Sequence, residues 1–407
     1  MTSYIAESAV EEVCLDYFAS LGWSVLYGPE IAPGEPRAER TSYRDVLLEA
    51  RLCSAVERLN PHLFPAEVSD VVATFRRPES VDLGAENWRT YAMLTRGVPV
   101  ERRLADGTLR SDLARLVDFD DPARNDFVVV NQFSIEGDNH TRRPDVVAFV
   151  NGVPLGLIEL KAPGQERATL RGAFDQLRTY AAQIPALIAF NACCVISTGT
   201  QARIGPLPER FEHFAPWKTI DGARLAPAGS PEMEVLVRGV FEPARFLDLL
   251  RSFVSFSDER AGLVKRLAKY HQFHAVNKAV AATVEAIGRG DGRAGVVWHT
   301  QGSGKSLEML FCVTKLMDTP PWRTQPSWSS RIATIWTTSS STRCSPPLAP
   351  CLSDPFRPSL GSTCAASWQR GRQVGSCSPR CRSSGERSPN ATPTAAILCC
   401  RSVPTSW

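Results

Sequence analysis

The sequence predicts an α/β fold: a domain built on a mixed β-sheet, then the start of a second α/β domain, then an unstructured tail. Three observations lead to this prediction. Helical and strand patterns alternate from residue 3 to residue 198, with a hairpin pattern among them. A glycine-rich loop at residues 302–306 follows an apolar run and precedes a helical pattern. Beyond residue 318 neither periodicity continues.

The elements of the first domain follow in the order helix, strand, hairpin, helix and strand, which suits a mixed sheet. Gly22 and Pro185 mark the ends of two of the helices. The predicted ranges are a helix at 3–22, further helices within 41–118, a strand at 126–134, the hairpin at 142–163, a helix at 165–184 and a buried strand at 186–198.

Residues 142–163, RRPDVVAFVNGVPLGLIELKAP, carry the clearest indication of chemistry. Asp145 is followed, after thirteen residues, by Glu159-x-Lys161, which is the pattern of PD-(D/E)xK nucleases. Glu159 and Lys161, two residues apart on a strand, point to the same side. Two carboxylates can hold a divalent cation such as Mg²⁺, and the cation with a nearby ammonium can activate water and neutralise a phosphodiester. The alternative is a structural hairpin with solvated charges.

The turn of this hairpin allows a geometric prediction. Asn151-Gly152 is a typical turn sequence. A two-residue turn would pair Asp145 with Ile158 and send Glu159 to the opposite face of the hairpin. An odd loop with a left-handed Gly152 would place both acids on one face. We therefore predict an odd loop, or a bulge near Asp145.

A second unit begins near residue 246, with helical patterns at 245–256 and 269–287. The segment VVWHTQGSGKSLEMLFCVTKLM then follows the order strand, glycine loop and helix, with Val296 and Val297 in the strand. Backbone amides at the start of such a helix face phosphate, the lysine meets the outer phosphates and the serine reaches magnesium. The predicted ATP–Mg²⁺ site comprises Gly302, Ser303, Gly304, Lys305 and Ser306.

The composition limits the class of protein. A net charge of +3 means that any nucleic-acid contact must come from a local patch. The N-terminus lacks the pattern of a signal peptide and no apolar run is long enough to span a bilayer, so we expect a cytoplasmic protein without a membrane partner. The twelve cysteines lack the spacing and the histidines of a zinc site, so we expect no metal cluster.

Together these motifs resemble one family, the motor-nuclease (R) subunits of type I restriction enzymes. The resemblance covers roughly residues 5–317. It rests on GPEIAPGE at 28–35, NQFSIEG at 131–137, the hairpin at 142–163, QLRTY at 176–180, KYHQFHAVNKAV at 269–280 and VVWHTQGSGKSL at 296–307.

The resemblance implies a PD-(D/E)xK restriction-endonuclease-like domain followed by the start of a RecA-like helicase domain. It implies that Asp145, Glu159 and Lys161 cut double-stranded DNA with Mg²⁺, assisted by Gln176 and Tyr180. Such subunits act together with methylation and specificity subunits, and cut far from the recognition site.

The same resemblance assigns the nucleotide site. It implies that Gln272 reads adenine, whereas on the residues alone Gln272 is a surface polar residue of a helix. It also implies that Lys305 and Ser306 bind ATP–Mg²⁺, which drives the movement of DNA.

These patterns predict a nuclease domain at 1–245, a fragment of a RecA-like domain at 246–318 and a disordered tail at 319–407. The tail contains no lysine or tyrosine, and its abrupt onset indicates a frameshift near residue 318. Shifted reading of the codons for residues 327–344 permits VVVTDRNDLDDQLFDTL, which suits the next strand and loop of such a motor.

A chain truncated in this way is expected to lack ATP-driven translocation. The alternatives are a stand-alone DNA-binding or nicking nuclease and a non-functional product.

Overall fold

The structure is a computed structural model that describes residues 7–103, 107–162, 169–207, 209–259, 262–290 and 293–319. The chain divides into two compact units, residues 1–278 with 299–316, and residues 279–298 with 317–407. Apart from residue 319, the predicted tail lies outside the described residues, so the disorder and the frameshift remain predictions.

The first unit is built around a six-stranded mixed sheet, which confirms the predicted sheet type. Strands β1 and β4 are parallel, as are β8 and β9, and the other neighbours are antiparallel. In spatial order the strands are β1 (Ser24–Tyr27), β4 (Phe127–Asn131), β7 (Val146–Val150), β8 (Val153–Leu160), β9 (Cys193–Ser197) and β10 (Ala202–Gly205).

The central strands are buried along their whole length. Every residue of β7, VVAFV, and of β8, VPLGLIEL, is buried. Nearly continuous apolar sequence is the pattern of strands that are covered on both faces. A charged residue in such a strand, as Glu159 is, has to be held by specific partners.

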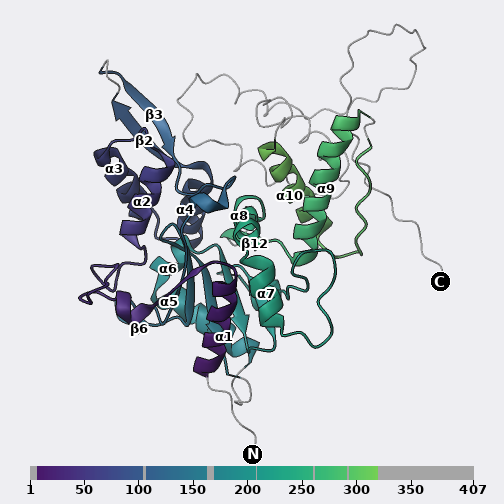
Figure 1. The fold of residues 1–407 in the computed structure, drawn as a ribbon, viewed down its shortest axis with the longest axis horizontal. Helices are drawn as coiled ribbons and strands as arrows, with labels where there is room; N and C mark the ends of the chain where they lie inside the picture. The colour runs from purple at the N-terminus through teal and green to yellow at the C-terminus, as the bar shows by residue number, and fades with distance from the viewer. Residues whose placement is uncertain are drawn as a thin grey trace, which may run out of the picture. The chain divides into compact units, whose positions relative to one another are not determined.

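Helices cover the sheet (Figure 1). Helix α1 (Glu7–Ser20) packs against α7 (Glu232–Val240), and the two contact β1, β4, β8 and β10 between them. Helix α5 (Leu170–Gln183) packs on β8 and β9, followed by the short α6 (Pro185–Phe190). The first helix and the helix at 165–184 are thus confirmed within the described residues.

Further helices precede strand β4, as predicted for residues 41–118. They are α2 (Glu49–Leu59), α3 (Pro65–Arg76) and α4 (Leu83–Arg96). A two-stranded ribbon, β2 (Val98–Arg103) and β3 (Leu109–Ala114), was not predicted. The connections carry three 3-10 helices and a small ribbon: η1 (Gly28–Ile31), η2 (Pro122–Arg124), η3 (Phe211–His213), β5 (Ile135–Glu136) and β6 (Thr141–Arg142).

The domain boundary predicted after residue 245 lies inside helix α8 (Pro243–Ser252). Phe246 of this helix packs on Trp23 and Phe241, with ring centroids 5.8 and 4.8 Å away. The hairpin of β11 (Val254–Glu259) and β12 (Gly262–Leu267) follows, and β12 packs on α4. Helix α8 therefore shares the core of the preceding domain.

Two predicted elements change type along their length. The predicted strand at 186–198 is helix α6 followed by strand β9, because Pro185 at the first helical position favours a helix. The predicted helix at 245–256 ends at Ser252, and β11 begins at Val254.

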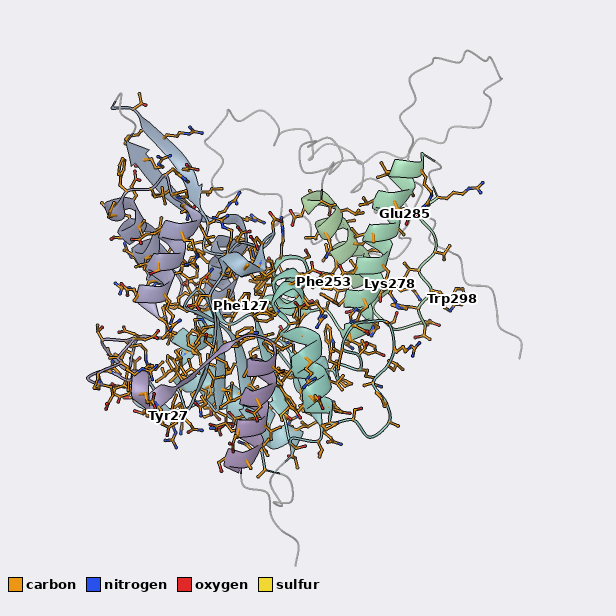
Figure 2. All side chains as sticks on the ribbon, viewed as in Figure 1. Tyr27, Phe127, Phe253, Lys278, Glu285 and Trp298 are labelled. Atoms are coloured by element: carbon orange, nitrogen blue, oxygen red, sulfur yellow. The ribbon has the colours of Figure 1, made fainter. Side chains whose placement is uncertain are left out.

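The last predicted strand is absent from the described residues around 296–297. Val296, Val297 and Trp298 are 63%, 49% and 80% exposed, and the chain forms no strand there. Figure 2 shows Trp298 on a stretch of chain without helix or strand. A strand of this kind needs hydrogen-bonded neighbours on a sheet, and no described strand pairs with it. Helix α9 (Tyr270–Arg289) and helix α10 (Lys305–Asp318) do form as predicted. None of the helices in the described ranges has the length and apolar character needed to cross a bilayer.

Candidate active site

The β7–β8 hairpin turns through two residues, so the predicted odd loop is wrong. Val150 pairs with Val153, and Asn151 and Gly152 between them have φ angles of 51° and 79°. Positive φ at both positions is typical of a type I′ turn, for which Asn-Gly is the preferred sequence. A Cβ atom on Gly152 would lie 2.4 Å from the carbonyl oxygen of Leu48, so the turn also needs glycine for close packing.

A bulge in β8 places the two predicted acids on one face. The pairing shifts so that Leu155 is an extra residue relative to β7. Beyond it Val146 pairs with Ile158, and the same register sets Asp145 opposite Glu159. Side chains of opposite residues project from the same face of a hairpin. A bulge is therefore present, but it lies near the turn, so its predicted position near Asp145 is wrong.

Glu159 is almost fully enclosed, as is Tyr180. It is 2% exposed, and its two carboxylate oxygens have separate partners. Lys161 Nζ donates to Oε1 over 2.6 Å, and the hydroxyl of Tyr180 donates to Oε2 over 3.0 Å. Asp145 Oδ2 accepts the backbone N–H of Leu160, between the other two predicted residues, over 2.7 Å. The structure thus brings Asp145, Glu159, Lys161 and Tyr180 together.

Burial and like charge make ionisation of the two acids unfavourable. Burial raises the pKa of Glu159 to about 8, and the charge of Asp145 adds to this against the lowering effects of Lys161 and Tyr180. Burial likewise raises the pKa of Asp145 to about 6, although the Leu160 N–H and Lys161 oppose the shift. The pair therefore lacks compensating positive charge in the folded chain.

Lys161 is the cation shared by this cluster. Burial alone would lower the pKa of its ammonium, but the charges of Glu159, Asp145 and Glu7 raise it overall. Its Nζ also lies 3.3 Å from Glu7 Oε1, at the first turn of α1. Lys161 therefore stays protonated, as a group that stabilises negative charge must be.

Glu11, on helix α1, is a fourth acid beside this cluster. It is 7% exposed, and the side-chain amides of Asn131 and Gln132 donate to its two oxygens over 2.6 and 2.5 Å. Its charge contributes to the raised pKa of Asp145. Gln132 has a φ of 55°, which few residues other than glycine adopt. The signal in the sequence was weak, because an acid on an amphipathic helix is usually solvated.

Tyr180 and Gln176 stand one helical turn apart on α5, as their spacing indicated. Burial, followed by the charge of Glu159, raises the pKa of Tyr180, and a hydrogen bond from Gln176 opposes the shift. The phenol therefore remains a neutral donor that orients the carboxylate of Glu159. Gln176 is hydrogen-bonded to the same hydroxyl.

The donor set fits a hard divalent cation. Asp145 and Glu159 supply carboxylate oxygens on one face, and their raised pKa values mark a deficit of positive charge that a cation would relieve. In the described ranges no group of three or more His, Cys, Asp or Glu side chains has the arrangement of a metal cluster. The five cysteines of these ranges are all free thiols.

The predicted phosphate loop has part of the expected geometry. Gly302 and Gly304 have φ of 83° and 88°, and α10 begins at Lys305. Lys305 Nζ donates to the carbonyl oxygens of His299 and Thr300 over 2.9 and 3.2 Å. The lysine therefore folds back over its own loop at the helix start.

Gln272 contacts this loop, although its residue type alone indicated a surface position. It is 2% exposed, and its Nε2 donates to the carbonyl oxygens of Ser303 and Gly304 over 3.1 and 3.4 Å. Its Oε1 accepts the backbone N–H of Lys269 over 2.9 Å. The structure brings Gln272, Ser303 and Gly304 together, and Ser306 follows within the first turn of α10.

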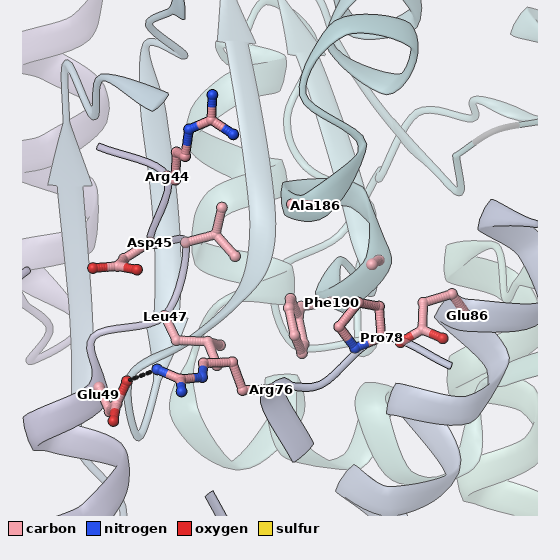
Figure 3. A pocket seen from close by; sticks show the side chains of 11 residues that line it. Arg44, Asp45, Leu47, Glu49, Arg76, Pro78, Glu86, Ala186 and Phe190 are labelled. Atoms are coloured by element: carbon pink, nitrogen blue, oxygen red, sulfur yellow. Dashed lines mark hydrogen bonds and ion pairs between the residues drawn. The ribbon is translucent and has the colours of Figure 1, made fainter. Parts of the chain in front are cut away.

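One pocket in the described part of the chain lies away from these two groups of residues. Its volume is about 250 Å³, and helices α3 and α6 and the segment before α2 line it (Figure 3). Arg76 and Glu49, 2.8 Å apart, form an exposed ion pair at its wall. No predicted site residue lines it.

Comparisons with known proteins agree with the resemblance seen in the sequence. Residues 4–213 match the family model described as type I restriction enzyme R protein N terminus. Residues 271–326, which include Gln272 and the glycine loop, match the model of the SWI2/SNF2 ATPases.

Two curated relatives are similar over most of the chain. The endonuclease subunit of the type I restriction enzyme HindI from Haemophilus influenzae is 39% identical over 321 residues, which are 77% of the chain and 30% of that relative. The MjaIXP endonuclease subunit of Methanocaldococcus jannaschii is 30% identical over 331 residues, 76% of the chain and 31% of the relative. The chain thus spans about a third of the length of these relatives.

Proposed function

Because the chain belongs to the family of type I restriction enzyme R proteins, we propose that its first domain hydrolyses DNA phosphodiester bonds with Mg²⁺. The convergence of Asp145, Glu159 and Lys161 on one end of the β7–β8 hairpin carries the proposal. Solvated carboxylates would suit a structural hairpin, whereas here a half-buried and a buried acid lie on the same face of the hairpin, and both have raised pKa values.

The residues divide the work by their chemistry. Asp145 and Glu159 would hold the cation, which supplies Lewis-acid activation of water and of the phosphate when bound. Lys161 keeps its proton and donates toward the negative charge that develops on the phosphate. Tyr180 and Gln176 fix the orientation of Glu159 through the phenol hydroxyl.

Metal binding and cleavage can be tested separately. We expect the full chain to nick supercoiled plasmid DNA in Mg²⁺, and Lys161→Ala to lower the rate at least about 100-fold. We also expect Ca²⁺, which occupies oxygen sites without supporting cleavage, to raise the midpoint of thermal unfolding. Glu159→Gln should abolish this rise. Unchanged nicking by Lys161→Ala, together with no Ca²⁺ effect, would contradict the proposal.

The glycine loop supports a second activity, the binding of ATP–Mg²⁺. The observation that favours it is the position of Lys305 and Ser306 at the start of α10, behind two glycines of positive φ and beside Gln272. Helix starts of this kind bind phosphate through backbone amides. Gln272, with its amide beside the loop, would read adenine. Fluorescent ATP should bind to the full chain and not to Lys305→Ala.

The family supplies the wider setting of the proposal. We propose that the chain acts on double-stranded DNA with methylation and specificity subunits, in an ATP-dependent restriction complex located in the cytoplasm. Co-purification of the tagged chain with both subunits tests this assembly. A chain that nicks DNA but co-purifies with neither subunit would favour a stand-alone nicking nuclease, and a chain that does neither a non-functional product.

A further inference from the structure

Two arginines from different elements meet on one aromatic ring away from the acidic cluster. The guanidinium carbons of Arg171, at the start of α5, and of Arg203, on strand β10, lie 5.4 and 5.5 Å from the ring centroid of Phe211. Phe211 belongs to η3 and is partly exposed. Cations over an aromatic face are held in place while they keep their outward hydrogen-bond donors.

The strand that carries Arg203 is part of the six-stranded sheet. Ala202 and Ile204 of the edge strand β10 are buried, and Arg203 alternates to the other face, which is that of Gly205. A Cβ atom on Gly205 would lie 2.6 Å from Phe214, so glycine makes room for that ring.

Phe174 of α5 packs against both Phe211 and Phe214. Its ring centroid lies 5.3 Å from that of Phe214 and 5.5 Å from that of Phe211. The two arginines are therefore presented by a packed aromatic stack and not by a loop tip.

The positive charge of this pair is weakly compensated. Arg171 faces Asp175 over 3.4 Å, but both side chains are more than half exposed, at 56% and 55%. Exposed pairs of this kind contribute little. Arg203 forms no ion pair within the described ranges. With a net charge of only +3 on the chain, such local pairs have to supply any attraction to nucleic acid.

Helix α5 connects this arginine pair to the acidic cluster. Arg171 stands nine residues before Tyr180, which corresponds to about 14 Å along the helix axis. At 3.4 Å per nucleotide along a duplex strand, this spacing is roughly four base pairs. One DNA duplex can therefore contact the arginine pair and the acidic cluster at the same time.

We propose that Arg171, Arg203 and Phe211 form a contact for the phosphate backbone of DNA beside the cleavage site. The proposal rests on the proposed function, since it presumes a DNA substrate. Backbone contacts fix the position of a duplex without reading its sequence. The pair thus holds the strand whose phosphate lies at the acidic cluster.

Binding at different salt concentrations tests the contact. The affinity of the full chain for a fluorescent 30-base-pair duplex is measured in Ca²⁺ over a range of KCl concentrations. For the double variant Arg171→Ala/Arg203→Ala we expect at least about tenfold weaker binding, and a salt slope lower by about two. Phe211→Leu keeps both charges, so we expect weaker binding with a nearly unchanged slope.

Arg76→Ala is the matched control, because Arg76 is as exposed as Arg171, at 55%, and pairs with an exposed acid. It should leave affinity and slope unchanged. Circular dichroism and the Ca²⁺-induced thermal shift confirm that each variant is folded and binds metal.

If the unmodified chain binds duplex and the double variant binds equally well with the same slope, the backbone contact is wrong while the proposed nuclease stands. If the unmodified chain neither binds nor nicks DNA, both are wrong.

Discussion

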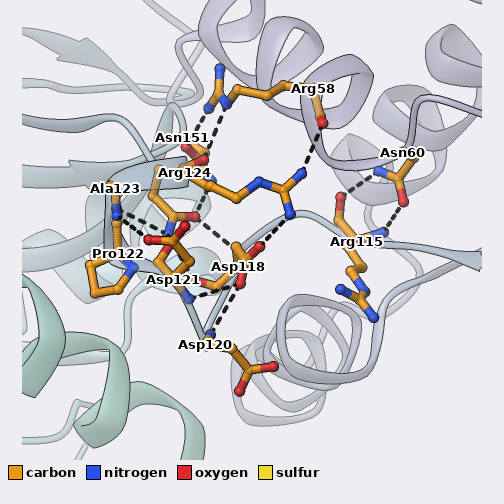
Figure 4. Close-up of polar contacts among 11 residues, drawn as sticks. Arg58, Asn60, Arg115, Asp118, Asp120, Asp121, Pro122, Ala123, Arg124 and Asn151 are labelled. Atoms are coloured by element: carbon orange, nitrogen blue, oxygen red, sulfur yellow. Dashed lines mark hydrogen bonds and ion pairs between the residues drawn. The ribbon is translucent and has the colours of Figure 1, made fainter.

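The two ends of the β7–β8 hairpin differ in how their polar groups are satisfied. At the turn, Asn151 is fully buried and both polar atoms of its side chain are hydrogen-bonded. Figure 4 shows it beside Arg58. Its oxygen accepts the N–H of Asp126 and a donor of Arg58 over 2.7 and 3.3 Å. Its nitrogen donates to Leu116 O and Asn125 Oδ1, both over 2.9 Å.

The open end of the same hairpin is unbalanced. The half-buried carboxyl group of Asp145 and the buried one of Glu159 share the ammonium of Lys161, and both acids have raised pKa values. The two ends of the hairpin therefore differ in role. Complete hydrogen bonding fixes the register at the turn, and that register holds an unfavourable charge arrangement at the other end, where a bound cation would relieve it.

The largest expected effect comes from removing the residue that links the two ends. Deletion of Leu155 removes the bulge, so Asp145 no longer stands opposite Glu159. We expect the nicking rate to fall at least about 100-fold, since misplacement of catalytic groups by about 1 Å is costly. The Ca²⁺-induced thermal shift should disappear as well.

Leu155→Ala separates register from packing. It keeps the extra residue but loses a side chain that is 1% exposed, at a cost of about 2–5 kcal/mol in the free energy of unfolding. Nicking should survive in this variant at temperatures where it is folded. A deletion variant that is folded and still active would contradict the role of the bulge.

At the turn, Asn151→Ala should strongly destabilise the fold. It leaves buried partners unsatisfied and places alanine at a φ of 51°, which together cost about 3–5 kcal/mol. Urea unfolding measures the loss. Asn151→Gly removes the same hydrogen bonds without the backbone strain, so its loss should be smaller by about 1 kcal/mol. Equal stability of all three chains would contradict the role of the turn.

The sequence was sufficient to place the two acids and the lysine on one hairpin, but not to locate the bulge. Spacing and residue type identified Asp145, Glu159 and Lys161, and Asn-Gly identified the turn. The position of the bulge depends on contacts outside the hairpin, such as the bond from Ala192 N to Leu155 O over 2.8 Å. The alternation of side chains along a strand shows that an extra residue is needed to bring both acids to one face, but it does not show where that residue lies.

The environment of Glu11 and the type of the segment at 186–198 could not be predicted, for a related reason. Glu11 lies on the predicted first helix, but its partners Asn131 and Gln132 come from a strand end over a hundred residues away. The segment at 186–198 is apolar except at Asn191, Ser197 and Thr198. Periodicity cannot separate a short buried helix from a strand in such a run.

The third prediction concerns the charge at the open end. The folded-state pKa of Glu159 is raised from 4.5 to about 8, so the folded chain binds more protons than the unfolded chain between these pH values. Its contribution to stability therefore falls as pH rises through this window. Thermal unfolding without metal should show this loss, and Glu159→Gln should reduce it.

Added Ca²⁺ should have the opposite dependence on pH. The cation needs both acids ionised, so its stabilising effect should grow from pH 5.5 to pH 8.5. A rise of several degrees at saturating Ca²⁺ is expected at the upper end. A shift that is equal at both pH values would mean that the metal binds elsewhere.

The smallest effect is expected at Tyr180. Its hydroxyl donates to Glu159 Oε2 over 3.0 Å and lowers the pKa of this acid. A hydrogen bond to a charged group contributes about 1.5 kcal/mol, so Tyr180→Phe should move the pH midpoint of Ca²⁺ stabilisation upward by about one unit. Tyr91→Phe is the matched control, because that hydroxyl donates to the carbonyl oxygens of Leu250 and Val254 over 3.0 and 3.2 Å. Tyr180→Phe keeps the aromatic ring, so little packing should be lost. Any loss of packing would lower the unfolding midpoint at every pH, and the pH midpoint of Ca²⁺ stabilisation would stay the same. Only a displaced midpoint identifies the phenol as the group that tunes Glu159.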